Sequence, residues 1–124
     1  MAFEKGPYLQ VAAFCEQVIQ DKSGVLSLIN VVDRIMCTAS GTEVPDEMPP
    51  YDLNWKLVLM LKSGEVKGSR AIKIVPELPS AETKSPMILT VHFEGGNRGA
   101  NVVANFQMKM EMPGVYWLNV YFDN

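Results

Sequence analysis

The sequence contains few of the residues that usually carry chemistry. Its 124 residues include one histidine, two cysteines and no excess of positive charge, and the formal net charge is −3. A chain of this charge has little to attract the phosphates of nucleic acid, so we do not expect nucleic-acid binding. No segment approaches the roughly 18 apolar residues that a membrane-spanning helix needs, so we expect no membrane partner either.

The two cysteines and the N-terminal residues indicate a compartment. Cys15 and Cys37 lack the spacing of metal ligands, and residues 1–7 contain no apolar core of the kind a secretory signal requires. Cysteines in a protein that is not exported are normally reduced. We therefore expect a cytoplasmic protein with two buried, unbonded cysteines and no bound metal or cofactor.

The overall composition is that of a globular domain. Apolar residues make up 48% and charged residues 20% of the chain, which is close to the average for folded proteins. A chain of this length can build one hydrophobic core of useful size. We therefore expect residues 1–124 to form a single domain.

Alternation of apolar and polar residues predicts β-strands over much of the chain. The clearest strand is 52–62, where every second residue from Leu53 to Leu61 is large and apolar. The same alternation predicts strands over 70–75, 87–94, 102–112 and 115–122. Prolines and glycines predict connecting loops over 38–51, 76–86 and 95–99.

The first third of the chain is less regular. Residues 24–35 begin at a turn signal and are rich in β-branched side chains, which predicts the central strand of the domain. The apolar pattern changes phase near Ile29 and Asn30, which indicates either burial on both faces or a bulge. By propensity, 12–20 is compatible with a short helix, but the short connection favours a strand paired with 24–35.

Together these segments predict an all-β fold. About seven strands at a spacing of 8–15 residues are typical of an antiparallel β-sandwich of immunoglobulin-like or related topology. The cysteine–tryptophan–cysteine order of antibody domains is missing, because Trp55 follows both cysteines.

Three polar residues are candidates for a catalytic or metal-binding role. Asp33 has apolar neighbours on its predicted face, Glu16 lies on the preceding strand, and His92 is the one histidine. If all three converged, they could serve a small hydrolase or a metal enzyme. A structural role for Asp33 and a polar-face position for His92 are the alternatives that we favour, because no partner lies nearby in the sequence.

Other patterns have a chemical and a structural interpretation. Asp46, Glu47 and Asp52 lack the alternating oxygen ligands of a calcium loop, and solvated loop acids are favoured. The glycine-rich run 95–99 sits between two predicted strands, which favours a hairpin over a phosphate loop. Methionines at every second position from 108 to 112 favour core packing over copper binding.

Several short segments carry a resemblance. These are Ala-Phe-Cys-Glu at 13–16, Ser-Gly-Val-Leu-Ser-Leu-Ile at 23–29, Val-Asp-Arg-Ile at 32–35, Pro-Gly-Val-Tyr-Trp at 113–117 and Val-Tyr-Phe-Asp at 120–123. They resemble a family of small bacterial all-β proteins catalogued as a domain of unknown function. The resemblance implies a β-sandwich and a further strand beyond the position of Asn124, and it implies no activity, cofactor or site residue.

A candidate partner surface follows from the last strand. The segment 122–124 is half of a hairpin signal, so we expect the final sheet to lack a closing strand and to offer an open edge. Outward side chains of two strands are apolar enough to bind a partner there: Val58, Met60, Trp117 and Tyr121. The alternative is that these residues are isolated exposed side chains or are covered by a loop.

Three functions of different classes are compatible with these patterns. The first is a non-enzymatic interaction or assembly module that forms a homo-oligomer or binds a protein partner through the sheet edge and the aromatic face. The second is a small-ligand or carbohydrate-binding sandwich with Trp117 and Tyr121 as a stacking platform over a groove lined with Asn and Asp. The third is the small hydrolase described above. We favour the first, with no catalytic residues.

Overall fold

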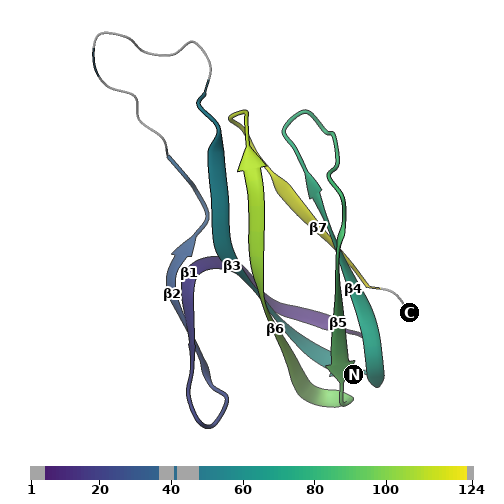
Figure 1. The fold of residues 1–124 in the computed structure, drawn as a ribbon. Helices are drawn as coiled ribbons and strands as arrows, with labels where there is room; N and C mark the ends of the chain where they lie inside the picture. Colours follow the sequence, from purple (N-terminus) through teal and green to yellow (C-terminus); the bar gives the residue numbers. More distant parts are fainter. Residues whose placement is uncertain (1–4, 37–40, 42–47, 123–124) are drawn as a thin grey trace. The chain divides into compact units, whose positions relative to one another are not determined.

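Only β-strands make up the regular structure in the computed structural model, which describes residues 5–36, 41 and 48–122 (Figure 1). In this part of the chain, no helix is long and apolar enough to cross a membrane. The seven strands are β1 (Tyr8–Gln20), β2 (Leu26–Val32), β3 (Tyr51–Gly64), β4 (Gly68–Glu77), β5 (Met87–Phe93), β6 (Gly96–Met110) and β7 (Trp117–Phe122).

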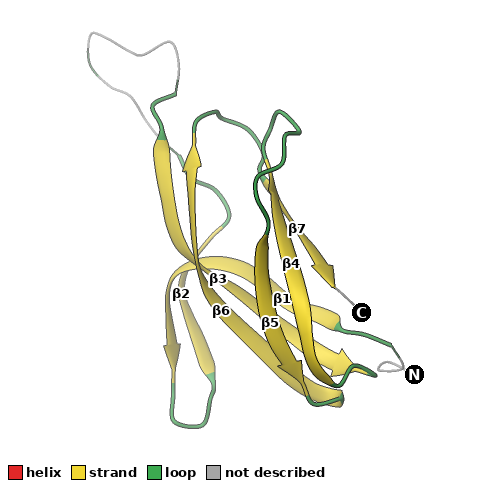
Figure 2. Ribbon diagram, turned by 45° about the vertical axis from the view of Figure 1, so that its right-hand side comes forward, coloured by secondary structure: helices red, strands yellow, loops and turns green. Residues whose placement is uncertain are grey.

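The strands form two sheets. One has the order β2-β1-β3-β6 and the other has the order β5-β4-β7 (Figure 2). Seven antiparallel strands in two sheets confirm the predicted all-β, sandwich-like class. The immunoglobulin-like alternative is not confirmed, because constant-type domains place their first, second, fourth and fifth strands in one sheet, whereas here the first three strands share a sheet with the sixth.

The chain folds into two compact units. Unit 1 comprises Met1–Val11, Leu59–Val102 and Gly114–Asn124, and unit 2 comprises Ala12–Val58 and Val103–Pro113. The whole β5-β4-β7 sheet belongs to unit 1, and the β1–β2 hairpin after Val11 belongs to unit 2.

In unit 2, β1 and β2 form the predicted hairpin. Residues 12–20 are strand and not helix, and they pair with β2 in one antiparallel register. Cys15 is free and fully buried, as expected, whereas Cys37 lies outside the described residues. The expectation that 24–35 is the central strand is wrong, because β2 is the first strand of its sheet and has a neighbour on one side only among the described strands. A strand at the edge shares fewer core contacts, and Val31 is accordingly exposed.

The phase change in β2 has a local cause. Cys15 pairs with Val31 and Gln17 with Ile29, so the register is the same on both sides of Asn30 and no bulge residue is inserted. Asn30 instead has a φ of 56°, in the left-handed region that asparagine tolerates. Its Nδ2 donates a hydrogen bond of 2.7 Å to Oε2 of Glu16. This bond gives the predicted candidate Glu16 a structural partner on the hairpin.

The core of unit 2 contains one face of β1, β3 and β6. The rings of Phe14 and Phe106 lie 5.5 Å apart and are tilted, a favourable geometry for an aromatic pair. Leu53 and Leu57 of β3 are also buried, and their even separation places them on one face of the strand. On β6, the predicted alternation is confirmed, because Phe106 is buried while Asn105 and Gln107 are exposed.

In unit 1, β4 is the middle strand of its sheet. It pairs with β5 from Gly68 to Ile74 and with β7 from Ile72 to Glu77, antiparallel in both cases. Ile72 and Ile74 are buried on its inner face. The rings of Phe93 and Phe122 meet edge to face, with centroids 5.9 Å apart, on the same inner side. Such an arrangement contributes roughly 0.5–1.5 kcal/mol beyond the area that it buries.

The strand β4 runs through Pro76, which the sequence assigned to a loop. In an antiparallel strand, the N–H and C=O of one residue point to the same side. The Pro76 carbonyl accepts a hydrogen bond from the Lys84 N–H, 2.9 Å away, and so points away from β7. The β5 pairing has already ended at Ile74. The proline therefore interrupts no ladder bond, and the strand can continue to Glu77.

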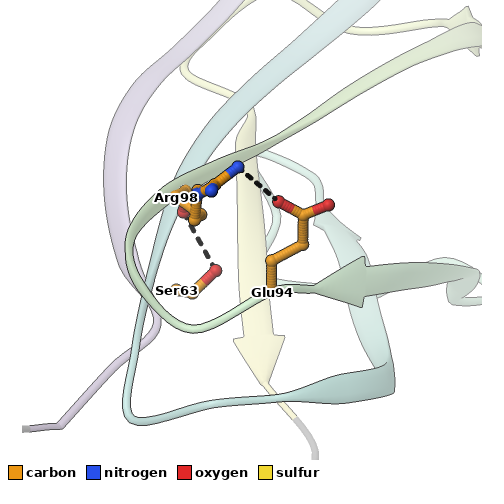
Figure 3. Close-up of polar contacts among 3 residues, drawn as sticks. All are labelled: Ser63, Glu94 and Arg98. Carbon is orange, nitrogen blue, oxygen red and sulfur yellow. Dashed lines mark hydrogen bonds and ion pairs between the residues drawn. The ribbon is translucent and has the colours of Figure 1, made fainter.

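The end of β3 is fixed by two backbone contacts in unit 1. The buried Ser63 hydroxyl donates a hydrogen bond of 2.9 Å to the Arg98 carbonyl, and the Arg98 guanidinium lies 3.4 Å from the Glu94 carboxylate (Figure 3). The Glu65 N–H donates a bond of 2.8 Å to the Lys5 carbonyl. Gly64 makes room for this contact, because a Cβ there would lie 1.6 Å from the Lys5 oxygen.

Substitution of two glycines with almost the same φ angle tests the contact between Gly64 and Lys5. Gly64 and Gly96 have φ of 65° and 63°, but a Cβ on Gly96 would meet nothing within 4 Å. We expect Gly96→Ala to cost about 1–2 kcal/mol of unfolding free energy from left-handed strain alone. Gly64→Ala should cost clearly more, since the Lys5 segment must also move. Urea unfolding of both variants measures the difference, and equal losses would contradict the proposed role of the contact.

The β1–β2 turn predicts a pH dependence. Asp21 Oδ1 accepts bonds from the Ser23 hydroxyl at 2.6 Å, the Ser23 N–H at 2.8 Å and the Val25 N–H at 3.0 Å. These bonds hold the pKa of Asp21 below its ordinary value of 3.8, and the bond from the Ser23 hydroxyl has the largest effect. A lowered pKa stabilises the fold above the unfolded-state value, and this contribution is lost as the pH falls through the folded-state value.

We therefore expect the stability difference between wild type and Asp21→Asn to be present near neutral pH and to shrink once the pH falls below 3.8. Urea midpoints measured from pH 6 to about pH 2 test this. Asn at this position keeps an acceptor oxygen but does not titrate, so it is the matched control. A difference that stays constant over this range would contradict the assignment.

Candidate functional site

The outer face of the β5-β4-β7 sheet carries the largest exposed side chains of unit 1. It is defined by the residues that alternate with the buried Ile72, Ile74, Val91 and Phe93. Its members are Ser69, Ala71, Lys73, Val75 and Glu77 on β4, Ile88, Thr90 and His92 on β5, and Trp117, Asn119 and Tyr121 on β7. We call this set the outer face.

The strand register sets the rows of the outer face. Lys73 stands opposite Ile88 on one side and opposite Tyr121 on the other. Glu77 stands opposite Trp117. Trp117 is 60% exposed, Tyr121 53% and Ile88 58%. The two exposed aromatic residues of β7 therefore each have a charged cross-strand neighbour, Glu77 for Trp117 and Lys73 for Tyr121, and both rings are open to solvent.

The strand β7 is also an edge. Among the described strands it pairs with β4 only, so the backbone groups on its other side have no strand partner there. No charged residue occurs between Trp117 and Phe122. Natural edge strands commonly carry lysine or another charge that prevents further pairing. An uncharged edge with two large rings is therefore open to a partner strand.

Two of the four residues of the predicted partner surface are exposed, and two are not. Trp117 and Tyr121 are both exposed and lie on the same face of β7, as predicted. Met60 is half-buried and Val58 is fully buried on β3, so Val58 cannot form part of an exposed surface. The reason is that β3 has a strand on each side and is buried on both faces from Leu57 to Leu59. In such a strand, the alternation of side chains between the two faces does not predict which of them are exposed.

The three candidate catalytic residues are divided between the units, with Glu16 and Asp33 in unit 2 and His92 in unit 1. Asp33 follows β2 and is exposed, Glu16 is bonded to Asn30, and His92 is exposed on β5, on its polar face as predicted. Within the described part of unit 2, no hydrogen bond joins Glu16 to Asp33. No group of three metal-ligating side chains is found within residues 5–36, 41 and 48–122 either.

The loop acids and the glycine-rich run considered in the sequence analysis show no sign of a binding site in the described residues. Asp46 and Glu47 lie outside the described residues, and Asp52 is exposed at the start of β3. The glycine run begins in the turn after β5, and from Gly96 it belongs to β6, so the predicted loop is shorter than expected. A strand, and not a helix, follows these glycines, unlike the helix that a phosphate loop requires.

Each unit has an open recess among its described residues. The recess in unit 1 has a volume of about 380 Å³ and is lined by Lys5, Gly6, Glu65, Val66, Arg70 and Phe122. The recess in unit 2 has a volume of about 390 Å³ and is lined by Asp52, Leu53, Asn54, Gln107, Met108 and Lys109. Neither lining includes Trp117 or Tyr121, so neither recess provides the aromatic platform that carbohydrate binding was expected to use.

No protein-family profile, curated protein or solved structure matches the chain. The resemblance to the bacterial all-β family therefore stays a prediction.

Sequence reasoning missed the neighbours of the two rings. Alternation predicts a strand over 87–94, but nothing in the sequence places Ile88 in a row with Lys73 and Tyr121. Glu77 was assigned to a loop, yet it is the residue opposite Trp117. Alternation within a strand predicts a face, whereas these rows depend on the pairing of strands far apart in the chain.

The corrected surface predicts how two substitutions differ. Val58→Ser buries a hydroxyl in place of an apolar side chain and should cost about 1–3 kcal/mol of unfolding free energy, or more where the hydroxyl finds no partner. Tyr121→Ser removes only an exposed cross-strand contact and should cost less than about 1 kcal/mol. Urea unfolding measures both, and a larger loss at Tyr121 than at Val58 would contradict the assignment of the face.

Proposed function

We propose that the chain is a protein-interaction module that binds through the outer face and the free edge of β7. The observation that carries the proposal is the position of Trp117 and Tyr121, exposed on one face of an uncharged edge strand. Tryptophan and tyrosine are enriched among the residues that supply most of the binding energy at protein interfaces. An unpaired strand edge supplies main-chain hydrogen bonds to a partner in extended conformation.

The residues around the rings fit the same role. Ile88 and Val75 extend the apolar part of the face, while Lys73 and Glu77 place one charge of each sign beside it. Interfaces commonly combine an apolar centre of this kind with a polar rim. A face built only for contact with water has no need of two large rings.

Other functions have less support from the geometry. The predicted carbohydrate site would place Trp117 and Tyr121 over a recess, and the recess described in each unit is lined by other residues. A hydrolase needs an acid and a base within hydrogen-bond reach of its substrate, and the candidate Glu16 is instead bonded to Asn30. We therefore propose a non-enzymatic role. A cytoplasmic location is part of the proposal, and the free thiol of Cys15 supports it.

The experiment compares two double variants with wild type. Trp117→Ser with Tyr121→Ser removes the rings of the outer face. Val31→Ser with Val103→Ser removes two exposed side chains of unit 2 and is the matched control. Each protein is immobilised and exposed to chemical cross-linking with its own soluble form and with cell extract, and covalent adducts are identified by mass spectrometry. We expect adducts that wild type and control form in common and that the face variant loses at least tenfold.

A circular dichroism spectrum and a thermal unfolding curve for each variant show that the fold is kept. The proposal is wrong if the face variant, correctly folded, forms the same adducts in the same amounts as wild type.

A further inference from the structure

We infer that the partner of β7 is β7 of a second copy of this chain, paired antiparallel about a two-fold axis at Asn119. This inference rests on the proposed function and names the partner of the same surface. It would join two three-stranded sheets into one continuous sheet across the pair of β7 strands.

Symmetry restricts how two such strands can pair. A two-fold axis that makes two identical strands antiparallel within one sheet is perpendicular to that sheet, so each residue keeps its face. Directly opposed residues also share a face, and side chains alternate between the faces along a strand. A residue can therefore oppose only residues an even number of positions away, and one residue must lie opposite its own copy.

Centres at Leu118, Asn119 and Val120 pair more of β7 with its copy than a centre at Trp117, Tyr121 or Phe122 does. A centre at Leu118 opposes Trp117 to the partner's Asn119, and a centre at Val120 opposes Tyr121 to the partner's Asn119. Only a centre at Asn119 opposes Trp117 to the partner's Tyr121. Because the two rings lie two residues to either side of Asn119, this register forms two aromatic pairs at once.

The inner face supports the same register. With Asn119 at the axis, Leu118 opposes the partner's Val120, so an apolar residue meets an apolar residue. Val120 is 37% exposed although it belongs to the inner face, as its pairing with the buried Ile74 shows. Apolar surface on this side of the edge would therefore also be covered.

Charges flank the aromatic pairs in a complementary way. On one side of each pair, Lys73 stands opposite Tyr121. On the other side, the partner's Glu77 stands opposite the partner's Trp117. Each row across the joined sheets then runs from a lysine through two rings to a glutamate, and no like charges face each other. Four rings at the centre and charges at the border resemble the composition of protein interfaces.

The other edge strands are less suited to this pairing. Strand β2 contains Asn30 in a left-handed conformation, which disturbs a regular ladder. Strand β6 carries Arg98 and Lys109, charges that discourage further pairing. Strand β5 offers Ile88 as its one large exposed apolar side chain. The two rings of β7 have no equivalent on these edges.

The expected dimer is weak. Pairing along six residues covers less than the roughly 1,200 Å² that stable interfaces bury. We therefore expect a dimer that dissociates on dilution. Its dissociation constant should fall within a range that light scattering can follow, from about 1 µM to 1 mM.

The experiment measures the mass in solution of wild type, Asn119→Lys and Asn119→Asp by size exclusion with light scattering. At the axis, each variant places a charge opposite its own copy. Like charges directly opposed weaken strand pairing, so we expect the dissociation constant of each variant to rise roughly fivefold or more. An equimolar mixture of the two variants should recover dimer, because lysine then opposes aspartate.

A cysteine at the axis gives an independent readout. Opposed residues of an antiparallel pair have Cα atoms roughly 4.5–5.5 Å apart, which a disulfide can bridge. Asn119→Cys should therefore form a covalent dimer on mild oxidation. Thr90→Cys, at the middle of the opposite edge strand β5, is the matched control and should not, and wild type reports any contribution of the native cysteines.

Three outcomes would overturn the inference: a wild type that is monomeric throughout the concentration range, a mixture that dimerises no better than the single variants, or a disulfide at position 90 in place of 119. None of these would by itself contradict the proposed function, which fails only if removal of the rings leaves all cross-linked adducts unchanged. The two experiments therefore separate a wrong partner from a wrong surface.

Discussion

The antiparallel register between β4 and β7 determines what the protein presents to its surroundings. Phe122 packs edge to face against Phe93 on the inner side, and Ile72 stands opposite Phe122 in the register. A slip of one residue would turn every side chain of β7 to the other face, exposing Phe122 and burying Tyr121. The packing of one aromatic residue in the core therefore fixes the exposure of its neighbour, so the core and the candidate surface are parts of one constraint.

Strand β4 is longer than its pairing with β5. Beyond Ile74, β4 has no β5 residue beside it, and a loop bonded to the Pro76 carbonyl takes that place. On its other side β4 keeps β7 as far as Glu77. The loop therefore takes the place of a strand beside the end of β4, while β5 and β7 are the two edges of the sheet. Neither edge strand contains Asp, Glu, Lys or Arg, and the large exposed rings occur on β7.

The sequence predicted the strands well because alternation is a local property. The β1–β2 hairpin, the inward phase of β6 and the outward position of Trp117 and Tyr121 all follow from neighbours within one strand. Errors arose where exposure depends on distant partners. Val58 is buried because β3 lies between two other strands, and β2 is an edge because β1 takes the inner position. The row that joins Ile88, Lys73 and Tyr121 depends on two pairings at once, and no local pattern contains it.

Self-association of an edge strand depends on parity as well as on hydrophobicity. For two residues to oppose each other across a two-fold axis, their numbers must differ by an even amount. Trp117 and Tyr121 satisfy this condition and have Asn119 midway between them. Had the rings been at odd separation, they would lie on opposite faces, and no symmetric pairing could bring them together. The spacing therefore distinguishes a strand whose rings can meet their own copies from one whose exposed rings need a different partner.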